Sequence, residues 1–151
     1  MPTTTSKDGT TIAFDRLGEG PAVVLIGGGP GDRTSNAPLA ELLADRFSVL
    51  NYDRRGRGES GDAPDWTPDR EYEDLAAVIA EAGGSAALIG NSGTGNIALE
   101  AAARGLPVTR LALWEPPSSS RARARPSRPT GAGGSTSSSP PAAPATRSST
   151  G

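Results

Sequence analysis

Apolar runs and polar segments alternate along the first 117 residues, and their lengths predict strands and helices in turn. Residues 22–26 are continuously apolar and rich in β-branched side chains, which is typical of a buried strand. Residues 10–16 alternate moderately between polar and apolar positions, and the turn Gly18-Glu19-Gly20-Pro21 separates the two segments. The pattern therefore predicts an antiparallel hairpin that leads into the buried strand.

An amphipathic segment at residues 38–43 and a short buried strand at residues 47–52 follow the hairpin. A longer helix is predicted to begin at Pro68, with Thr67 as its N-cap, and to end near Ala82, before two glycines.

Residues 86–103 read as an apolar strand, a tight glycine turn around Ser92 and a helix, and residues 108–114 form a last strand. The strands are apolar throughout and alternate with helices. This order predicts an α/β fold with a mostly parallel sheet covered by helices on both faces.

The composition changes abruptly after Pro117. Residues 118–151 contain only Ser, Arg, Ala, Pro, Thr and Gly, whereas all 17 acidic residues come earlier. A segment without large apolar side chains does not bury enough surface to offset its loss of conformational entropy. We therefore expect one domain over residues 1–117 and a disordered tail over residues 118–151. The arginines of this tail attract phosphate only non-specifically, so no specific nucleic-acid partner is expected.

The sequence contains no cysteine and no histidine. Without cysteine there are no disulfides or thiolate metal sites, and neither a metal nor another cofactor is expected. The polar N-terminus lacks a signal peptide pattern, and no apolar run reaches the roughly 18 residues that a membrane-spanning helix needs. A cytoplasmic protein with no membrane partner is therefore expected. The glycine-rich segments do not match a dinucleotide-binding or P-loop fingerprint.

Four motifs carry a resemblance to a known family. In order, they are Leu25-Ile26-Gly27-Gly28-Gly29-Pro30-Gly31, Tyr52-Asp53-Arg54-Arg55-Gly56-Arg57-Gly58-Glu59-Ser60, the turn around Ser92, and Leu113-Trp114-Glu115-Pro116-Pro117. Their order and spacing resemble the amino-terminal half of an α/β-hydrolase of the esterase, lipase and haloperoxidase-like kind, over about residues 7–117. The resemblance implies hydrolysis of an ester or related carbonyl compound by a nucleophilic serine. The triad acid and histidine of such enzymes follow later in the chain.

The resemblance implies that Ser92 occupies the nucleophile position; the alternative is a serine that caps the following helix. The oxyanion hole would be formed by the backbone N–H groups of Gly93 and of Gly29, which we prefer to Gly28 in the same loop. Alternatively, these glycines only serve tight turns. The family pattern has glycine where Thr94 stands, which puts the strained geometry of the turn in question.

Asp53 ends a predicted strand and resembles a triad acid by position alone. The resemblance implies instead that Asp53 holds its own loop, and we expect Arg54 or Arg57 as its partner.

A serine hydroxyl needs an adjacent base, nearly always an imidazole, and this sequence offers none. We therefore expect a truncated hydrolase that lacks the triad acid and histidine, is inactive alone, and acts on a small ester-like substrate only when completed. The change after Pro117 leads to the hypothesis of a shifted reading frame near that point. The competing interpretation is a non-catalytic interaction protein that uses the half-sheet as a binding surface. Its last strand would be a free edge open to self-association.

Overall fold

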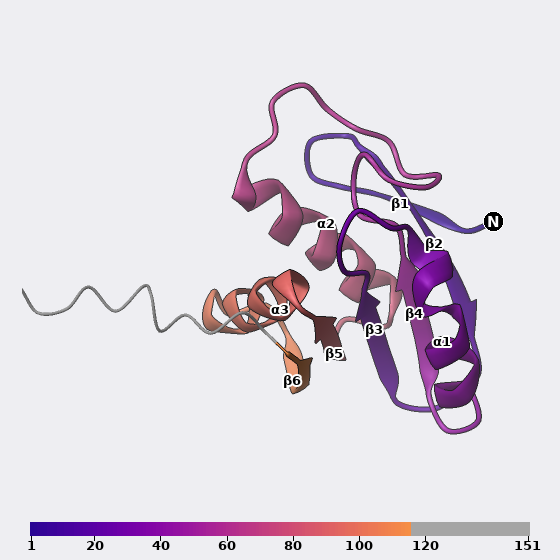
Figure 1. Cartoon of the computed structure of the whole chain (residues 1–151). Helices are drawn as coiled ribbons and strands as arrows, with labels where there is room; N and C mark the ends of the chain where they lie inside the picture. Colours follow the sequence, from indigo (N-terminus) through magenta and orange to yellow (C-terminus); the bar gives the residue numbers. More distant parts are fainter. Residues whose placement is uncertain (116–151) are drawn as a thin grey trace, which may run out of the picture. The chain divides into compact units, whose positions relative to one another are not determined.

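The structure, a computed structural model, describes residues 1–115 and is drawn in Figure 1. Its elements in chain order are β1 (Thr3–Thr5), β2 (Thr11–Leu17), β3 (Ala22–Ile26), the 3-10 helix η1 (Arg33–Asn36), α1 (Ala37–Leu43), β4 (Ser48–Tyr52), α2 (Pro68–Glu81), β5 (Ala86–Asn91), α3 (Gly93–Ala103) and β6 (Val108–Trp114). The predicted disordered tail, residues 118–151, lies outside the described residues.

All the strands of residues 1–115 join one six-stranded sheet in the order β1-β2-β4-β3-β5-β6. Strands β4, β3, β5 and β6 are parallel to one another, whereas β1 and β2 pair antiparallel. The predicted α/β class with a mostly parallel sheet is therefore confirmed. The short strand β1 and the helix η1 were not predicted.

The predicted hairpin between residues 10–16 and 22–26 is wrong, because β4 lies between the two segments. Val49 of β4 pairs antiparallel with Leu17 and parallel with Val23. The turn between β2 and β3 packs closely against the connection from α1 to β4. A Cβ atom at Gly18 would clash with this connection, because it would lie 2.3 Å from the carbonyl oxygen of Ala44. A continuously apolar strand such as β3 is buried best in the middle of a parallel sheet, where both edges and both faces are covered.

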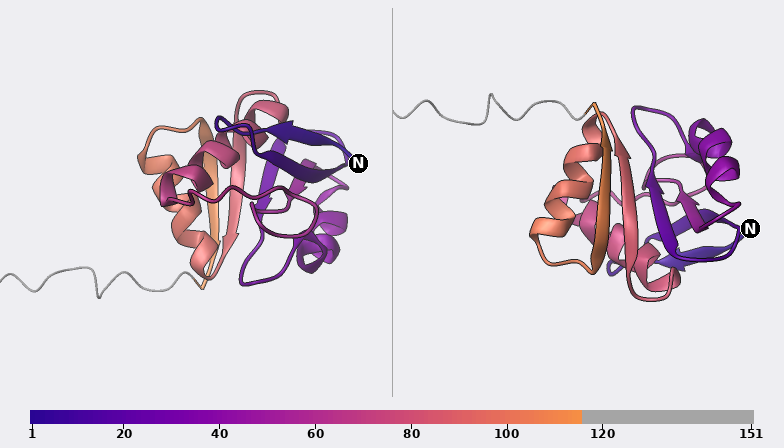
Figure 2. Two further views of the ribbon diagram at one scale, coloured as in Figure 1. Left: turned by 90° about the horizontal axis from the view of Figure 1, so that it is seen from above. Right: turned by 90° about the horizontal axis from the view of Figure 1, so that it is seen from below.

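Helices cover the two faces of the sheet unequally (Figure 2). On one face, α2 and α3 enclose the larger core, whose members include Leu75, Ile79 and Ala98. On the other face, α1 is the one α-helix of the described residues that packs against β3 and β4, and it does so through Ala40. Strand β6 forms one edge of the sheet, opposite β1, and Trp114 at its end is 68% exposed.

Within residues 1–115, no helix is both long enough and apolar enough to cross a membrane.

Candidate functional site

Three loops meet at the carboxyl edge of the parallel strands. Strand β3 leads into the loop of residues 27–31, β4 into the loop of residues 53–61, and β5 into the turn at Ser92. The register places Ile26 beside both Tyr52 and Gly90, so the three strands end side by side. In open α/β sheets, this edge is where ligands bind.

Ser92 stands in a backbone conformation that L-residues rarely adopt. Its φ is 54° and its ψ is −127°, at the junction of β5 and α3. The N–H of Ser92 donates to the carbonyl oxygen of Trp114 at 2.9 Å, and its own carbonyl accepts from the N–H of Gly95 at 3.0 Å. The side chain makes no capping hydrogen bond to α3, so the helix-capping alternative is not borne out. The turn holds Ser92 at the surface.

The turn requires glycine at position 90. A Cβ atom there would lie 2.7 Å from the carbonyl oxygen of Thr94 and 2.8 Å from the Cα of Gly95, closer than real Cβ contacts. Strand β5 and helix α3 therefore approach each other backbone to backbone.

Thr94 is compatible with the strained turn, although the family pattern has glycine there. The residue is 1% exposed, and its Oγ1 accepts a hydrogen bond from the N–H of Asn91 at 2.9 Å. The same hydroxyl lies within donating distance of the carbonyl oxygens of Asn91 (2.8 Å) and Ile26 (3.1 Å). The hydroxyl is thus satisfied inside the junction of β3 and β5.

The loop of residues 27–31 lies against the Ser92 turn. A Cβ atom on Gly28 would lie 3.1 Å from the carbonyl oxygen of Asn91. Gly29 has a φ of +63°, a conformation natural to glycine, and its carbonyl oxygen accepts a hydrogen bond from the Arg57 guanidinium. Gly93 is the first residue of α3, so its N–H has no acceptor within the helix. The oxyanion role of Gly29 and Gly93 stays a prediction.

Asp53 is fully buried and joins its own loop to the helix η1. Its carboxylate accepts from the N–H of Arg33 at 2.7 Å and from the N–H of Glu59 at 2.8 Å, and it also pairs with the Arg33 guanidinium. Asp53 therefore holds its loop as predicted, but the predicted partner is wrong: it is Arg33, not Arg54 or Arg57. Arg33 lies outside the four motifs of the family resemblance, and no local sequence pattern identifies it as the partner of Asp53.

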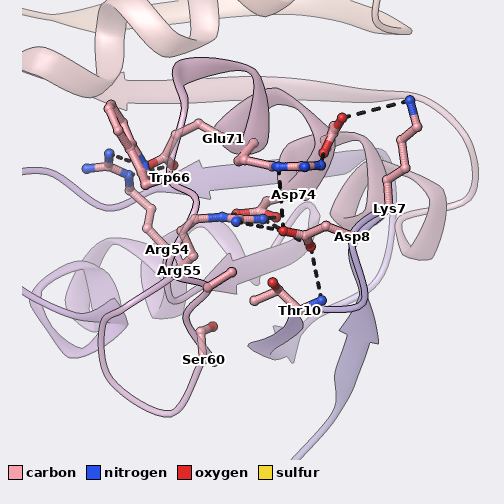
Figure 3. Close-up of polar contacts among 12 residues, drawn as sticks. Lys7, Asp8, Thr10, Arg54, Arg55, Ser60, Trp66, Glu71 and Asp74 are labelled. Carbon is pink, nitrogen blue, oxygen red and sulfur yellow. Dashed lines mark hydrogen bonds and ion pairs between the residues drawn. The ribbon is translucent and has the colours of Figure 1, made fainter.

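A second buried ion cluster fixes the loop of residues 53–61 to the helix α2 (Figure 3). The guanidinium of Arg55 binds both carboxylate oxygens of Asp74, at 2.8 and 2.6 Å, and reaches Asp8 at 2.9 Å. The hydrogen bond to Arg55, followed by that from the N–H of Thr10, holds the pKa of Asp8 well below its usual value. Beside this cluster, Arg54 pairs with Glu71 at 2.8 Å. The loop is thus anchored from two sides.

A largely apolar hollow of about 440 Å³ opens between α1 and the exposed part of the sheet. Leu25, Leu39 and Ile89 form part of its wall, and Asn91 and Trp114 stand at the end nearest the turn. Ser92, Gly29 and Gly93 do not line this hollow. Within residues 1–115, no group of three or more acidic side chains is arranged to hold a metal ion.

Comparison with known proteins gives one family. Residues 23–150 match the model of the Alpha/beta hydrolase family, further along the chain than the motifs alone indicate.

Among solved structures, an alpha/beta hydrolase from Sphaerobacter thermophilus is 57% identical over 77% of this chain and 45% of its own, with a TM-score of 0.76. A thermophilic esterase from Thermogutta terrifontis, solved with malate bound, is 33% identical over 74% of this chain and 44% of its own (TM-score 0.66). The N-formylmaleamic acid deformylase of Pseudomonas putida is 28% identical over 77% of this chain and 46% of its own (TM-score 0.70). The chain spans less than half the length of each of these proteins.

Proposed function

Because the chain belongs to the Alpha/beta hydrolase family, we propose that Ser92 is the nucleophile position of a serine hydrolase that acts on esters or related carbonyl compounds. The observation that carries this proposal is the backbone of Ser92, with a φ of 54° between a strand and a helix. Backbone strain of this kind concentrates at functional sites, and a strained strand-to-helix turn exposes the serine hydroxyl of such enzymes.

The chemistry follows from the groups around the turn. The Ser92 hydroxyl attacks the substrate carbonyl carbon while its proton passes to a base, and the N–H groups of Gly29 and Gly93 stabilise the oxyanion that forms. Collapse of this intermediate expels the protonated leaving group and leaves an acyl-serine, which water then hydrolyses. The sequence has no histidine, so we propose that the base comes from outside these 151 residues and that the chain alone is inactive.

Labelling with a fluorophosphonate, mapped by mass spectrometry, tests the role of Ser92 directly. Without added base, we expect no modification above that of the exposed serines Ser35 and Ser85, which serve as internal controls. Adding free imidazole replaces the missing base, and we expect modification of Ser92 that rises with imidazole concentration and is lost in Ser92→Ala. Equal, slow modification of all three serines at every imidazole concentration would refute the proposal.

A non-catalytic interaction protein is the second candidate function. It is favoured by the exposed strand β6 and by the apolar hollow beside it, which together offer a binding surface. If the protein is a binding module, the Ser92→Ala variant still binds the partner and the wild type shows no imidazole-dependent labelling. These two results distinguish a binding module from a hydrolase. For either function, we propose a cytoplasmic location and a domain boundary near residue 117.

A further inference from the structure

Arg57 differs from the other arginines of residues 1–115. Five arginines form ion pairs with carboxylates: Arg33, Arg54, Arg55, Arg70 and Arg104. In the described part of the chain, the other four arginines form no ion pair: Arg16, Arg46, Arg57 and Arg110. Of these four, only Arg57 is partly buried. Residues 116–151 contain no Asp or Glu that could pair with it.

The position of Arg57 places this uncompensated charge at the candidate site. Gly56 and Gly58 flank it with φ values of +71° and +51°, so the loop turns tightly on both sides of the residue. Its guanidinium donates to the carbonyl oxygen of Gly29. A Cβ atom on the neighbouring Gly28 would lie 3.1 Å from the carbonyl oxygen of Asn91, the residue before Ser92. The Arg57 guanidinium therefore lies against the loop of residues 27–31, which borders the Ser92 turn.

The guanidinium retains binding capacity for an anion. Burial, followed by the nearby Arg54, lowers the pKa of Arg57, and the charge of Glu71 offsets this only in part. The group nevertheless stays protonated at neutral pH, and a single carbonyl leaves most of its five N–H donors unused. A planar guanidinium binds a carboxylate through two parallel hydrogen bonds.

We propose that Arg57 binds a free carboxylate of the substrate while the reacting carbonyl lies at Ser92. The substrate class is then a monoester or monoamide of a dicarboxylic acid. This inference rests on the proposed function of Ser92. The bond to Gly29 holds the guanidinium in place before the substrate arrives, so little side-chain ordering is needed on binding.

Titration of the full chain with monomethyl succinate, followed by ¹⁵N NMR at the Gly29 amide and the Arg57 Nε, tests the proposal. We expect saturable shifts at both positions, and none with dimethyl succinate, in which a second methyl ester replaces the charged carboxylate. Arg57→Met should weaken binding about tenfold or more, the typical loss of a charged hydrogen bond. Arg46→Met removes an exposed arginine from the turn before β4 and should leave binding unchanged.

Arg57→Lys keeps the charge without the planar fork, so we expect intermediate binding, and this variant also guards against misfolding of Arg57→Met. Equal affinity of the wild type and both Arg57 variants would overturn the proposal, as would equal binding of the neutral diester. The two tests fail separately. If Ser92 is labelled but binding does not depend on Arg57, the proposed hydrolase function stands and the proposed substrate class is refuted. If binding depends on Arg57 but Ser92 is not labelled, the hydrolase function is refuted and Arg57 is only a carboxylate-binding site.

Discussion

The hydroxyl of Thr94 lies 3.1 Å from the carbonyl oxygen of Ile26, and so it ties the start of helix α3 to the end of strand β3. The N–H of Asn91 donates to the same hydroxyl at 2.9 Å. If residue 94 were glycine, no side chain would fill this space or accept that hydrogen bond. The threonine therefore replaces close backbone approach with a side-chain hydrogen bond, and the strained conformation of Ser92 persists beside it.

Replacing the buried Thr94 with valine should destabilise the protein, because the N–H of Asn91 would lose its acceptor while the packing volume stays similar. We expect a loss of about 1–3 kcal/mol in the free energy of unfolding, measured by urea denaturation. Thr94→Ser keeps the hydroxyl and is the matched control. A larger loss in the serine variant than in the valine variant would show that the methyl group, rather than the hydrogen bond, stabilises the junction.

Gly58 should tolerate alanine far less than Gly83, although both have positive φ values, +51° and +108°. A Cβ atom at Gly58 would lie 2.2 Å from the Asp53 carboxylate, whereas at Gly83 it would meet nothing within 4 Å. Gly83→Ala therefore measures backbone strain alone, about 1–3 kcal/mol. We expect Gly58→Ala to cost about 1–3 kcal/mol more, because Asp53 must move away from Arg33. Equal losses in thermal or urea unfolding would show that the Asp53 cluster yields easily.

Arg55→Met should be strongly destabilising, because it leaves the fully buried Asp74 without its partner. Removing one member of a buried ion pair typically costs about 3–5 kcal/mol. Arg104→Met breaks exposed pairs with Asp69 and Glu100, and such surface pairs are worth about 0–1 kcal/mol. Urea denaturation of both variants compares a buried and an exposed arginine in one protein. Similar losses would contradict the structural role assigned to Arg55.

Acid should weaken the same cluster through Asp8. The pKa of Asp8 is lowered in the folded protein from its ordinary value of 3.8, so its contribution to stability is present above about pH 4 and is lost as the pH falls below that value. Asp8→Asn lacks this titration. We therefore expect the difference in unfolding free energy between the wild type and Asp8→Asn to shrink as the pH is lowered from neutral toward 2. A difference that is constant over this range would show that Asp8 does not titrate with folding.

Local patterns predicted most of the fold, since apolar runs and turn residues act over short distances. Helix α2 begins at Pro68, as predicted, and ends at Glu81, one residue before the predicted end, although Thr67 makes no side-chain capping hydrogen bond. The order of the strands could not be predicted from local patterns. Strand β4 lies between β2 and β3 because this arrangement buries β3 in the middle of the sheet. The motif around Ser92 identified the turn, but it did not reveal how Thr94 fits there.

The partner of Asp53 could not be predicted either, since Arg33 is 20 residues away along the chain. Contacts of this kind depend on the meeting of loops in space.

The edge strand β6 leads to the last prediction, self-association of the chain. Its residues are mostly exposed, and in the described residues no strand pairs with its outer side. An unpaired edge presents free N–H and C=O groups that can bind another strand, and Leu111 and Trp114 add exposed apolar surface.

We expect the chain to form oligomers whose proportion rises with concentration in sedimentation velocity experiments. Leu111→Lys places a charge on the edge and should weaken association about tenfold or more, which corresponds to ~1.4 kcal/mol. Leu42→Lys makes the same chemical change on α1, where the leucine is 75% exposed, and it should leave association unchanged. If both variants weaken association equally, general apolar contact and not strand pairing holds the copies together, and a wild type that stays monomeric at all concentrations would contradict the prediction outright.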